Sequence, residues 1–531
     1  MARIKILPVY PRFPVTFWGH QGALEFLNKK SIMAPTGLAT IAAMVPLDDF
    51  EVLKIADLNV RDLDDAQLRN SDVIFTSTMT IQEDSHNDVI DRAHFYGKKV
   101  VAGGPFPSSY PERNSKADYI ISGEGEAVIK PFLKDLINGV AKREYSETDM
   151  IAAGRHSVGL TKTGRVDITY TPIPRWDLVD MSNYLSAAVQ FSRGCPFNCD
   201  FCDITKLYGR EPRTKTPQQM IGEFEALRKA GHKGHLFLVD DNFIGNKENV
   251  RKLLPYLRAW QERNHFPFYL FTEASINLAW PENRDLLKDM VQAGFCEVFV
   301  GIENTDVDAL RKMRKGQNLR MPLGESVTVM QNAGLAVMGG FIFGSDGSKA
   351  DTAEKMFDFI QANGIVVPMI GLLGAIKGTA LYNRLQAEGR LIRDLIGDDT
   401  NTHNSSFNFK TELPEDFLLG RYTWLLESLF DDKNYYNRCR VLDRNRGNHR
   451  RPTRFTVKDA SLAFVRSLRK QLFSRGAIQY IKYLAETALY RPRDFVYAVG
   501  NAIKLNHYKQ MTQQYLEKQK QKKNFVVAAS I

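Results

Sequence analysis

The segment Cys195-Pro196-Phe197-Asn198-Cys199-Asp200-Phe201-Cys202 decides how this 531-residue chain is interpreted. Its three cysteines have the spacing Cys-x3-Cys-x2-Cys and come directly after an apolar, strand-like run at Ala187–Ser192. The chain holds only five cysteines, so this spacing would arise by chance on the order of once in a thousand such chains. Thiolates are soft ligands that suit iron–sulfur clusters, zinc or copper(I). The segment therefore predicts a metal centre held by Cys195, Cys199 and Cys202.

A structural zinc site is the alternative to an iron–sulfur cluster. Such a site normally takes four protein ligands. The nearest histidines in the sequence are His156 and His232, and both are far from the cysteines along the chain. Three thiolates without a fourth ligand favour a four-iron cluster in which one iron stays open.

Residues 186–395 alternate strand-like and helix-like patterns and predict a barrel or partial barrel of six strand–helix units. The six strand-like runs are Ala187–Ser192, His235–Asp240, Phe268–Thr272, Val298–Ile302, Ala336–Phe343 and Met369–Leu373. Barrels of this kind place their chemistry at the carboxyl ends of the strands, so the polar residues there are candidate site residues. These candidates are Asp240, Asp241, Glu273, Ser275 and Glu303.

Residues 1–145 have the pattern of a separate α/β domain. Strand-like runs at 4–9, 52–57, 73–77, 99–103 and 119–122 alternate with helix-like stretches, which predicts a parallel sheet covered on both faces. Ligands of such sheets bind beyond the carboxyl ends of the strands. Three loops there are rich in small, flexible or hydroxyl-bearing residues. They contain Ser77, Thr78, Met79, Gly103, Gly104, Pro105, Gly123, Glu124, Gly125 and Glu126. They are candidates for close contact with a large ligand, and ordinary tight turns are the alternative.

The cysteine segment resembles the cluster loop of the radical S-adenosylmethionine superfamily. The resemblance implies a 4Fe–4S cluster on the three cysteines, with Phe201 beside the cofactor and S-adenosylmethionine on the open iron. Reductive cleavage would then give a 5′-deoxyadenosyl radical. Asp240 and Asp241 stand where that superfamily has a Gly-Gly-Glu signature. Acids at these strand ends would bind the ribose and amino groups of S-adenosylmethionine, or would serve only as caps and ion-pair partners.

The N-terminal domain resembles that of the cobalamin-binding branch of the superfamily. The resemblance implies that the three loops hold the corrin and its nucleotide tail. The Asp-x-His-x-x-Gly signature that supplies histidine to cobalt is absent, because Asp57-Leu58-Asn59-Val60 contains no histidine. We therefore expect cobalamin to bind without an imidazole ligand.

The C-terminal part, residues 396–531, is expected to form a helical domain with a disordered tail at 518–523. From residue 433 onward it holds 22 Lys and Arg against five Asp and Glu, whereas the whole chain carries +10. Such a segment should meet an anionic partner. Its helices resemble the extension of the subgroup that includes hopanoid C-2 methylase, whose substrates are lipophilic polycyclic molecules. One interpretation is a helix pair that contacts lipid; the alternative is a helical cap with buried aromatic residues.

Together these features predict an α/β chain with four parts: a Rossmann-like cobalamin domain at 1–145, a linker at 146–185, a partial (βα)6 TIM barrel at 186–395 and a helical domain at 396–531. The resemblance implies a C-methyltransferase that acts on an unactivated carbon of a hopanoid-like substrate, with flavodoxin or ferredoxin as electron donor. A non-methylating cyclase or oxidative rearrangement enzyme is the alternative.

The sequence also bears on location and on the remaining cysteines. No run approaches 18 apolar residues, so we expect a cytoplasmic protein with peripheral contact to the inner face of the membrane through 433–531. A nucleic-acid-directed methylthiotransferase is disfavoured, because those enzymes have further cysteines in the N-terminal domain and residues 1–194 here have none. Cys296 is expected to be a core thiol, and the role of Cys439 is left open.

Overall fold

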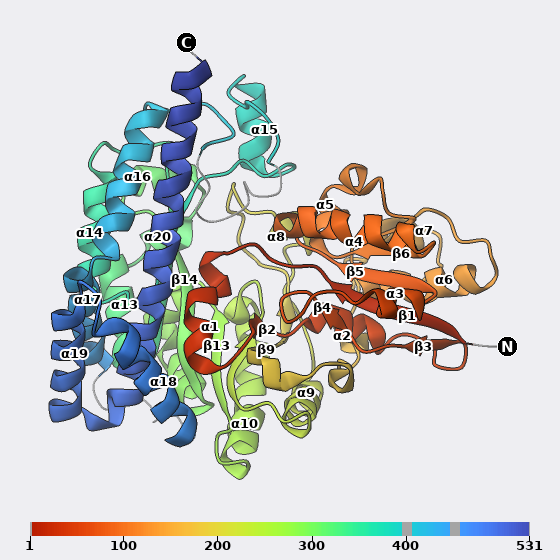
Figure 1. Ribbon diagram of the computed structural model, residues 1–531, viewed down its shortest axis with the longest axis horizontal. Helices are drawn as coiled ribbons and strands as arrows, with labels where there is room; N and C mark the ends of the chain where they lie inside the picture. Colours follow the sequence, from red (N-terminus) through yellow and green to blue (C-terminus); the bar gives the residue numbers. More distant parts are fainter. Residues whose placement is uncertain (1–2, 396–405, 447–456, 530–531) are drawn as a thin grey trace.

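The computed structural model describes residues 3–395, 406–446 and 457–529. Two parallel sheets and a group of C-terminal helices form the molecule (Figure 1). The predicted α/β fold class is confirmed. The boundary predicted at 395/396 adjoins residues 396–405, which lie outside the described residues.

The N-terminal sheet is parallel throughout, as predicted, with the strand order β3-β1-β5-β6-β7-β8 and with β4 also paired to β1. Its strands are β1 (Ile4–Tyr10), β3 (Phe50–Val52), β4 (Ala56–Asp57), β5 (Val73–Ser77), β6 (Lys99–Gly103), β7 (Tyr119–Ser122) and β8 (Glu144–Ser146). The run predicted at 52–57 is split into two short strands, and β8 was not predicted. Neighbouring residues such as Val100 and Val101 belong to two different hydrophobic clusters, because helices cover both faces of the sheet.

Helices connect the strand-like runs of this domain, as the alternating pattern predicts, but two short helices at 105–109 and 147–152 were not predicted. The helices of the domain are α2 (Thr36–Ala42), α3 (Asp65–Arg69), α4 (Glu83–Phe95), α5 (Pro105–Ser109), α6 (Gly125–Ile137) and α7 (Glu147–Ala152). Both α5 and α6 begin directly after a strand, so their first residues lie at the loop edge of the sheet. The predicted ligand loops therefore share one edge.

The second sheet is a curled, parallel half-barrel with the strand order β16-β15-β14-β13-β12-β9-β2. Six of its strands match the six predicted runs: β9 (Tyr184–Val189), β12 (Gly234–Leu238), β13 (Phe268–Glu273), β14 (Phe295–Glu303), β15 (Ala336–Phe343) and β16 (Pro368–Leu372). The seventh, β2 (Ser31–Met33), comes from the N-terminal region and pairs with β9. A three-residue strand carries too little pattern to be recognised in the sequence.

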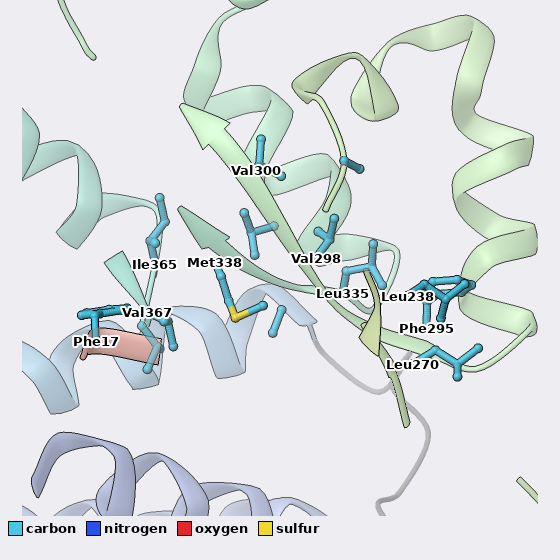
Figure 2. Close-up of a cluster of buried hydrophobic side chains, with 14 of the residues drawn as sticks. Phe17, Leu238, Leu270, Phe295, Val298, Val300, Leu335, Met338, Ile365 and Val367 are labelled. Atoms are coloured by element: carbon cyan, nitrogen blue, oxygen red, sulfur yellow. The ribbon is translucent and has the colours of Figure 1, made fainter. Parts of the chain in front are cut away.

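Successive residues of each half-barrel strand point alternately to the outer face, which the helices cover, and to the hollow inside. Leu236, Leu238, Leu270 and Val298 are fully buried on the outer face, where many of the side chains of Figure 2 lie. The outer helices are α9 (Pro217–Lys229), α10 (Lys247–Arg263), α11 (Arg284–Gln292), α12 (Val307–Lys312), α13 (Leu323–Asn332), α14 (Thr352–Ala362) and α15 (Ala380–Ala387). The short helix α8 (Ile204–Leu207) follows the cysteines, and β10 (Ser192–Arg193) pairs antiparallel with β11 (Arg213–Thr214).

Residues 17–33 leave the N-terminal sheet and join the other two parts of the molecule. Helix α1 (Gln21–Leu27) lies against the C-terminal helices α18 (Val457–Gln471) and α20 (Phe495–Ala529). Figure 1 shows this red helix beside the blue α20. The ring of Phe17 stacks on that of Tyr508 with centroids 4.8 Å apart, and Figure 2 places Phe17 near Val367. The N-terminal segment thus helps to close the open side of the half-barrel.

The C-terminal part is helical, as predicted. Its helices are α16 (Glu415–Leu429), α17 (Asp432–Arg446), α18 (Val457–Gln471), α19 (Ala477–Tyr490) and α20 (Phe495–Ala529). The prediction of a disordered tail at 518–523 is wrong, because α20 continues through it. Lys and Gln are good helix formers, and the Gln519 side chain bonds to the Tyr515 hydroxyl one turn earlier. Among the described residues, no helix is long and apolar enough to span a bilayer.

Candidate active site

The cysteine loop begins at the β10–β11 pair. The Cys195 N–H donates to the Gly209 carbonyl at 3.2 Å. Gly194 has φ +97°, and a Cβ there would lie 2.8 Å from the Glu211 carbonyl oxygen, so only glycine fits. All three thiols are partly exposed and free of disulfides. The loop therefore presents three soft donors at the carboxyl edge of the half-barrel.

Asp240 and Asp241 hold the backbone that leads into this loop. Asp240 accepts hydrogen bonds from the Phe191 N–H (2.8 Å) and from the Ser192 N–H (2.8 Å) and hydroxyl (2.7 Å). Asp241 accepts one from the Gly194 N–H at 2.7 Å. Burial raises the pKa of Asp240 to about 7, although the accepted hydrogen bonds lower it. Both oxygens of Asp240 accept hydrogen bonds from the chain, so Asp240 positions the backbone before the cysteines, and its contact with S-adenosylmethionine stays a prediction.

Glu303 and Lys315 form an ion pair beside the cysteines. Their Oε1 and Nζ atoms are 2.7 Å apart, and both side chains are nearly buried. The Lys315 ammonium also lies 5.8 Å from the ring centroid of Phe201. Burial alone would lower the pKa of Lys315, but Glu303 and Cys199 outweigh it and raise the pKa. Lys315 thus contacts both Glu303 and Phe201, two of the residues predicted for the site.

Lys315 and Gln317 are site residues that sequence reasoning missed. The Gln317 amide nitrogen lies 3.8 Å from the Cys199 sulfur. Both residues come from the segment after α12, which carries no recognisable motif. The adjacent basic residues Arg314-Lys315 after the fourth barrel strand were the one available signal.

Glu273 and Ser275 follow β13 and have different surroundings. The Glu273 side chain lines a large cavity, and no side chain in the described part of the chain pairs with it. Burial raises its pKa to about 8, with further contributions from Asp241, Asp240 and Glu303. Ser275 is tied down instead: its N–H donates to the Asn242 side-chain oxygen at 3.1 Å. Among the predicted acids, Glu273 is therefore the one whose carboxylate faces the cavity and can contact a ligand.

The donor set at this edge fits the predicted cluster and S-adenosylmethionine. Burial raises the pKa of all three thiols, that of Cys202 to about 12, so they are poor thiolates on their own. Coordination to a cation removes the proton from a thiol. Cys195, Cys199 and Cys202 would hold the cluster, and Glu273 would face the amino or hydroxyl groups of the bound S-adenosylmethionine.

The first two predicted cobalamin loops pack on each other. The Thr78 N–H donates to the Gly103 carbonyl (3.0 Å), and the Phe106 N–H donates to the Thr78 carbonyl (2.9 Å). Gly104 has φ +100°, and a Cβ there would lie 2.8 Å from the Thr78 nitrogen. The Thr78 hydroxyl is buried without a hydrogen-bond partner among the described residues. The two loops thus form one compact edge that requires glycine at position 104 and leaves the Thr78 hydroxyl without a partner among the described residues. This edge fits a bound nucleotide or corrin amide, and it consists of Ser77, Thr78, Gly103, Gly104 and Pro105.

The third loop joins the two sheets. Arg213 binds both carboxylate oxygens of Glu124, and Arg193 lies 3.0 Å from the carboxylate of Glu126. Burial raises the pKa of Glu126, but Arg193 outweighs it and brings the pKa to about 2. Both carboxylates are engaged by arginines, so they join the two sheets, and their contact with cobalamin stays a prediction. A Cβ at Gly123 would lie 2.6 Å from Glu147 and one at Gly125 2.6 Å from Ile41, so both glycines are needed for the packing of this loop.

Arg193 and Arg213 were also missed in the sequence. Arg193 precedes Cys195 by two residues, and both arginines belong to the β10–β11 pair. Basic residues on both sides of the cysteine motif were the available signal. They connect the loop edge of the N-terminal sheet directly to the cysteine loop.

A cavity of about 1900 Å³ runs from the N-terminal domain into the half-barrel. At the domain edge it is lined by Met79, Asn59 and Arg61. Inside the barrel its apolar lining includes Trp18, Phe237, Phe271, Phe299 and Met338. The rings of Phe237 and Phe271 stack with centroids 4.5 Å apart. Helices α1, α18 and α20 contribute a further part of the wall. The volume exceeds the roughly 300–1000 Å³ of ordinary ligand pockets, so a large apolar molecule fits.

The two isolated cysteines lie outside this lining. The Cys296 thiol donates to the Leu270 carbonyl at 3.5 Å, and burial raises its pKa to about 12. Cys439 is fully buried in α17, and burial raises its pKa as well. Both have the surroundings of inert thiols.

Comparisons with known proteins agree with this geometry. Residues 27–132 match the B12 binding domain, 189–360 the radical SAM superfamily, and 379–521 a domain of unknown function, DUF4070. An uncharacterized methyltransferase of Synechocystis sp. is 38% identical over 437 residues, which are 82% of this chain and 78% of that protein. Hopanoid C-2 methylase of Rhodopseudomonas palustris is 37% identical over 391 residues, covering 73% of this chain and 71% of that protein.

Solved structures share the fold at low sequence identity. The cobalamin-dependent S-adenosylmethionine radical enzyme OxsB aligns over 99% of this chain and 81% of its own, with a TM-score of 0.59 and 14% identity. The radical S-adenosylmethionine methyltransferase TsrM from Kitasatospora setae, solved with cobalamin and a [4Fe-4S] cluster, aligns over 96% of this chain and 100% of its own, with a TM-score of 0.56 and 14% identity. The arrangement of the three parts is therefore a known one.

Proposed function

Because the chain belongs to the cobalamin-dependent radical S-adenosylmethionine methyltransferase family, we propose that it methylates an unactivated carbon of a lipophilic, polycyclic, hopanoid-like substrate. The cofactors of this family are a 4Fe–4S cluster, S-adenosylmethionine and cobalamin, and when bound they supply hydrogen abstraction and a methyl donor. The chain itself has to bind the substrate between them and exclude water.

The large cavity is the observation that carries the proposal. It borders Met79 of the cobalamin domain and Glu273 near the cysteine loop, so one molecule inside it would face both cofactor regions. The half-barrel gives it an aromatic wall, with Phe237, Phe271 and Phe299 on adjacent strands and Phe299 level with Glu273. Rings stacked on rings favour a rigid, flat, apolar substrate. The name of the 37% identical relative supports a hopanoid as that substrate.

The site residues have distinct parts in this proposal. The three cysteines hold the cluster, and Asp240 and Asp241 fix the start of their loop. Lys315 holds Glu303 and places a positive charge beside Cys199. Reduction of the cluster needs an external electron, so we also propose flavodoxin or ferredoxin as the electron donor.

The experiment compares cells with the gene, cells without it and cells with the Cys199→Ser variant, all fed methionine carrying a deuterated methyl group. We expect a lipophilic species with one labelled methyl group only in cells with the intact gene, detected by mass spectrometry of lipid extracts. Absence of that species from cells whose protein carries cluster and cobalamin would contradict the proposal. Purified enzyme that forms 5′-deoxyadenosine without S-adenosylhomocysteine would instead indicate a non-methylating cyclase or oxidative rearrangement enzyme.

We further propose a cytoplasmic location with peripheral contact to the inner face of the membrane. The turn between α18 and α19 and the end of α19 expose large apolar side chains: Phe473 is 92% exposed, Ile478 78%, Leu489 72% and Tyr490 76%. Exposed cations at Arg475 and Lys482 flank them. Part of the aromatic pattern is core, since Tyr480 and Tyr483 are buried. Exposed apolar side chains beside cations fit an anionic lipid surface.

A further inference from the structure

Two exposed cations lie beside the cysteine loop in the segment that follows it. Arg210 donates a hydrogen bond at 3.1 Å to the carbonyl of Pro196, which lies between the first two cysteines. Lys206 of α8 comes four residues after Cys202, and its ammonium lies 3.4 Å from the Lys377 carbonyl. Both residues are exposed. These contacts place two positive charges at the surface next to the loop.

A second segment brings a third cation to the same loop. Residues 310–320 include five Lys and Arg and no Asp or Glu. The carbonyl of Met313 accepts a hydrogen bond from the Asp200 N–H at 3.2 Å, so this segment packs on the middle of the loop. Arg314 is the next residue, and it is exposed. The backbone that carries Arg314 is therefore in direct contact with the cysteine loop.

The three cations differ from their neighbours because no carboxylate pairs with them. Within the described parts of the chain, no ion pair includes Lys206, Arg210 or Arg314. A charged group without a partner keeps its field toward the solvent and attracts an opposite charge there. Other cations near the loop are neutralised in the pairs Lys312–Glu412, Lys377–Glu112 and Arg384–Asp346.

The charge of the rest of the molecule makes this group of cations distinctive. The part of the chain before residue 433 holds 56 Asp and Glu against 49 Lys and Arg, so it is mildly acidic. The thiols of Cys195, Cys199 and Cys202 are partly exposed, so the metal centre lies near the surface. An acidic partner drawn to the three cations would therefore come close to the metal centre.

We propose that Lys206, Arg210 and Arg314 form the docking site of an acidic one-electron carrier protein. The proposal rests on the proposed function, because it needs the cluster and an external electron. The reduced carrier loses one electron and the oxidised cluster gains it, and no bond forms or breaks in this step. Acidic side chains around the redox group of the carrier would face the three cations, which orients the two redox groups toward each other.

An acidic protein fits this face better than a lipid surface does. A helix that lies on a bilayer presents exposed apolar side chains beside its cations. In the described segments 203–212 and 310–318, no large apolar side chain is exposed. Three unpaired charges suit a transient encounter, because complementary charge acts mainly on the rate of association. Such an encounter is what a carrier needs if it is to leave after delivering its electron.

The experiment measures binding and electron delivery without substrate. An acidic flavodoxin is the probe: its oxidised form is bound to the purified holoenzyme by biolayer interferometry, and its reduced form reduces the cluster in a stopped-flow experiment. At about 0.01 M salt the screening length is about 30 Å. There the variant Lys206→Glu, Arg210→Glu, Arg314→Glu should bind about tenfold more weakly and be reduced about tenfold more slowly. At about 1 M salt the screening length is about 3 Å, so the difference should vanish.

Two further variants support this measurement. Arg314→Glu alone should lose about twofold to threefold in both readouts, and it keeps the test valid if the triple variant does not fold. The variant Arg475→Glu, Lys482→Glu, Arg493→Glu makes the same change of charge in and beside α19, which Figure 1 shows well away from α8. It should bind flavodoxin as the unaltered protein does, because its residues are far from the cysteine loop.

A small uncharged reductant separates docking from damage to the loop. Photoreduced 5-deazariboflavin needs no docking site, so it should reduce the cluster equally fast in every variant. Unchanged flavodoxin binding and reduction in the variants of Lys206, Arg210 and Arg314 would overturn the proposal. An equal loss in the α19 variant, or slower reduction by 5-deazariboflavin, would also overturn it. No methyl transfer is measured, so the result is independent of the labelled-methionine experiment.

Discussion

Arg213 donates hydrogen bonds to both carboxylate oxygens of Glu124, at 2.7 Å and 2.5 Å. The two side chains are 3% and 0% exposed, so the pair is buried between the N-terminal sheet and the β10–β11 pair that carries the cysteine loop. Glu124 directly precedes α6, and Arg213 lies in β11. The pair therefore fixes the distance between the loops predicted for cobalamin and the cysteines.

Replacing Arg213 should destabilise the contact between the two sheets. Arg213→Met removes the bidentate partner of the buried Glu124 carboxylate and leaves it only the longer contact with Arg193 at 3.3 Å. Breaking a buried pair costs about 3–5 kcal/mol. We expect this loss in the free energy of unfolding, measured by urea denaturation. Limited proteolysis should also cleave the chain more readily between the two sheets, within residues 147–183.

The control for this prediction is Arg228→Met. Arg228 pairs with Glu225 on the exposed face of α9, with side chains 41% and 30% exposed, so no measurable change is expected. The double variant Arg213→Met with Glu124→Gln should regain part of the lost stability, because no unpaired charge remains. Equal stability of Arg213→Met and the unaltered protein would show that the pair does not hold the domains.

Features with a strong local pattern were predictable from the sequence. The spacing of the cysteines needs only eight consecutive residues, and the six barrel strands are apolar runs between turns. Thr216 followed by Pro217 is a local start signal for a helix, and α9 begins there with a capping box between Thr216 and Gln219. Such signals lie within a few residues of one another, so no knowledge of the fold is needed.

Features that depend on distant contacts were not predictable. Strand β2 is three residues long and is defined by its pairing with β9 about 150 residues later. Glu124 looked like a ligand residue because its loop is rich in glycine, and only the fold places Arg213 against it. Lys504 and Glu297 are likewise ordinary charged residues until α20 is packed over the half-barrel. A single sequence carries no signal for such pairs.

The charge of Lys315 should tune the iron–sulfur cluster. The ammonium raises the local potential beside Cys199, so Lys315→Met makes addition of an electron less favourable. We expect a midpoint potential more negative by on the order of 60 mV, which corresponds to about 1.4 kcal/mol for one electron. A redox titration followed by electron paramagnetic resonance measures this shift.

Lys312→Met serves as the comparison for Lys315→Met. Lys312 lies three residues earlier and pairs with Glu412 at the surface, with side chains 48% and 43% exposed. Solvent screens such a charge, so its removal should leave the potential unchanged. An equal shift of the midpoint potential in both variants would contradict the prediction. It would mean that the net charge of the protein, and not the position of Lys315 beside the cluster, sets that potential.

Glu273 should make the stability of the apoprotein depend on pH. Its pKa is about 8 in the folded chain and near the ordinary value of 4.5 when unfolded. Because the folded chain holds the proton more tightly, this contribution to stability is complete below about pH 4.5 and is lost as the pH rises through about 8. Glu273→Gln stays neutral, so at about pH 9 it should be more stable than the unaltered protein by on the order of 2 kcal/mol. Urea denaturation at about pH 5 and about pH 9 tests this, and parallel pH profiles for the two proteins would contradict it.

The exposed apolar side chains around α19 should bind anionic membranes. Phe473 and Leu489 would each transfer apolar surface into the lipid, worth about 1.5–3 kcal/mol per side chain. We expect the protein to sediment with vesicles that contain phosphatidylglycerol. Phe473→Ser and Leu489→Ser should each weaken the binding about tenfold or more.

The salt dependence and a matched surface variant separate this contact from nonspecific adhesion. Phe95→Ser removes an aromatic side chain that is 81% exposed on α4, in the N-terminal domain, and should leave vesicle binding unchanged. Raising the salt to about 1 M shortens the screening length to about 3 Å, so the contribution of Arg475 and Lys482 should be lost and binding should fall. Two results would contradict a lipid-binding face formed by α18 and α19. One is vesicle binding that does not change with the salt concentration. The other is an equal loss of vesicle binding in Phe95→Ser and Phe473→Ser. A specific loss would place the membrane contact next to the wall of the cavity, because Leu462 and Phe464 of α18 line that cavity.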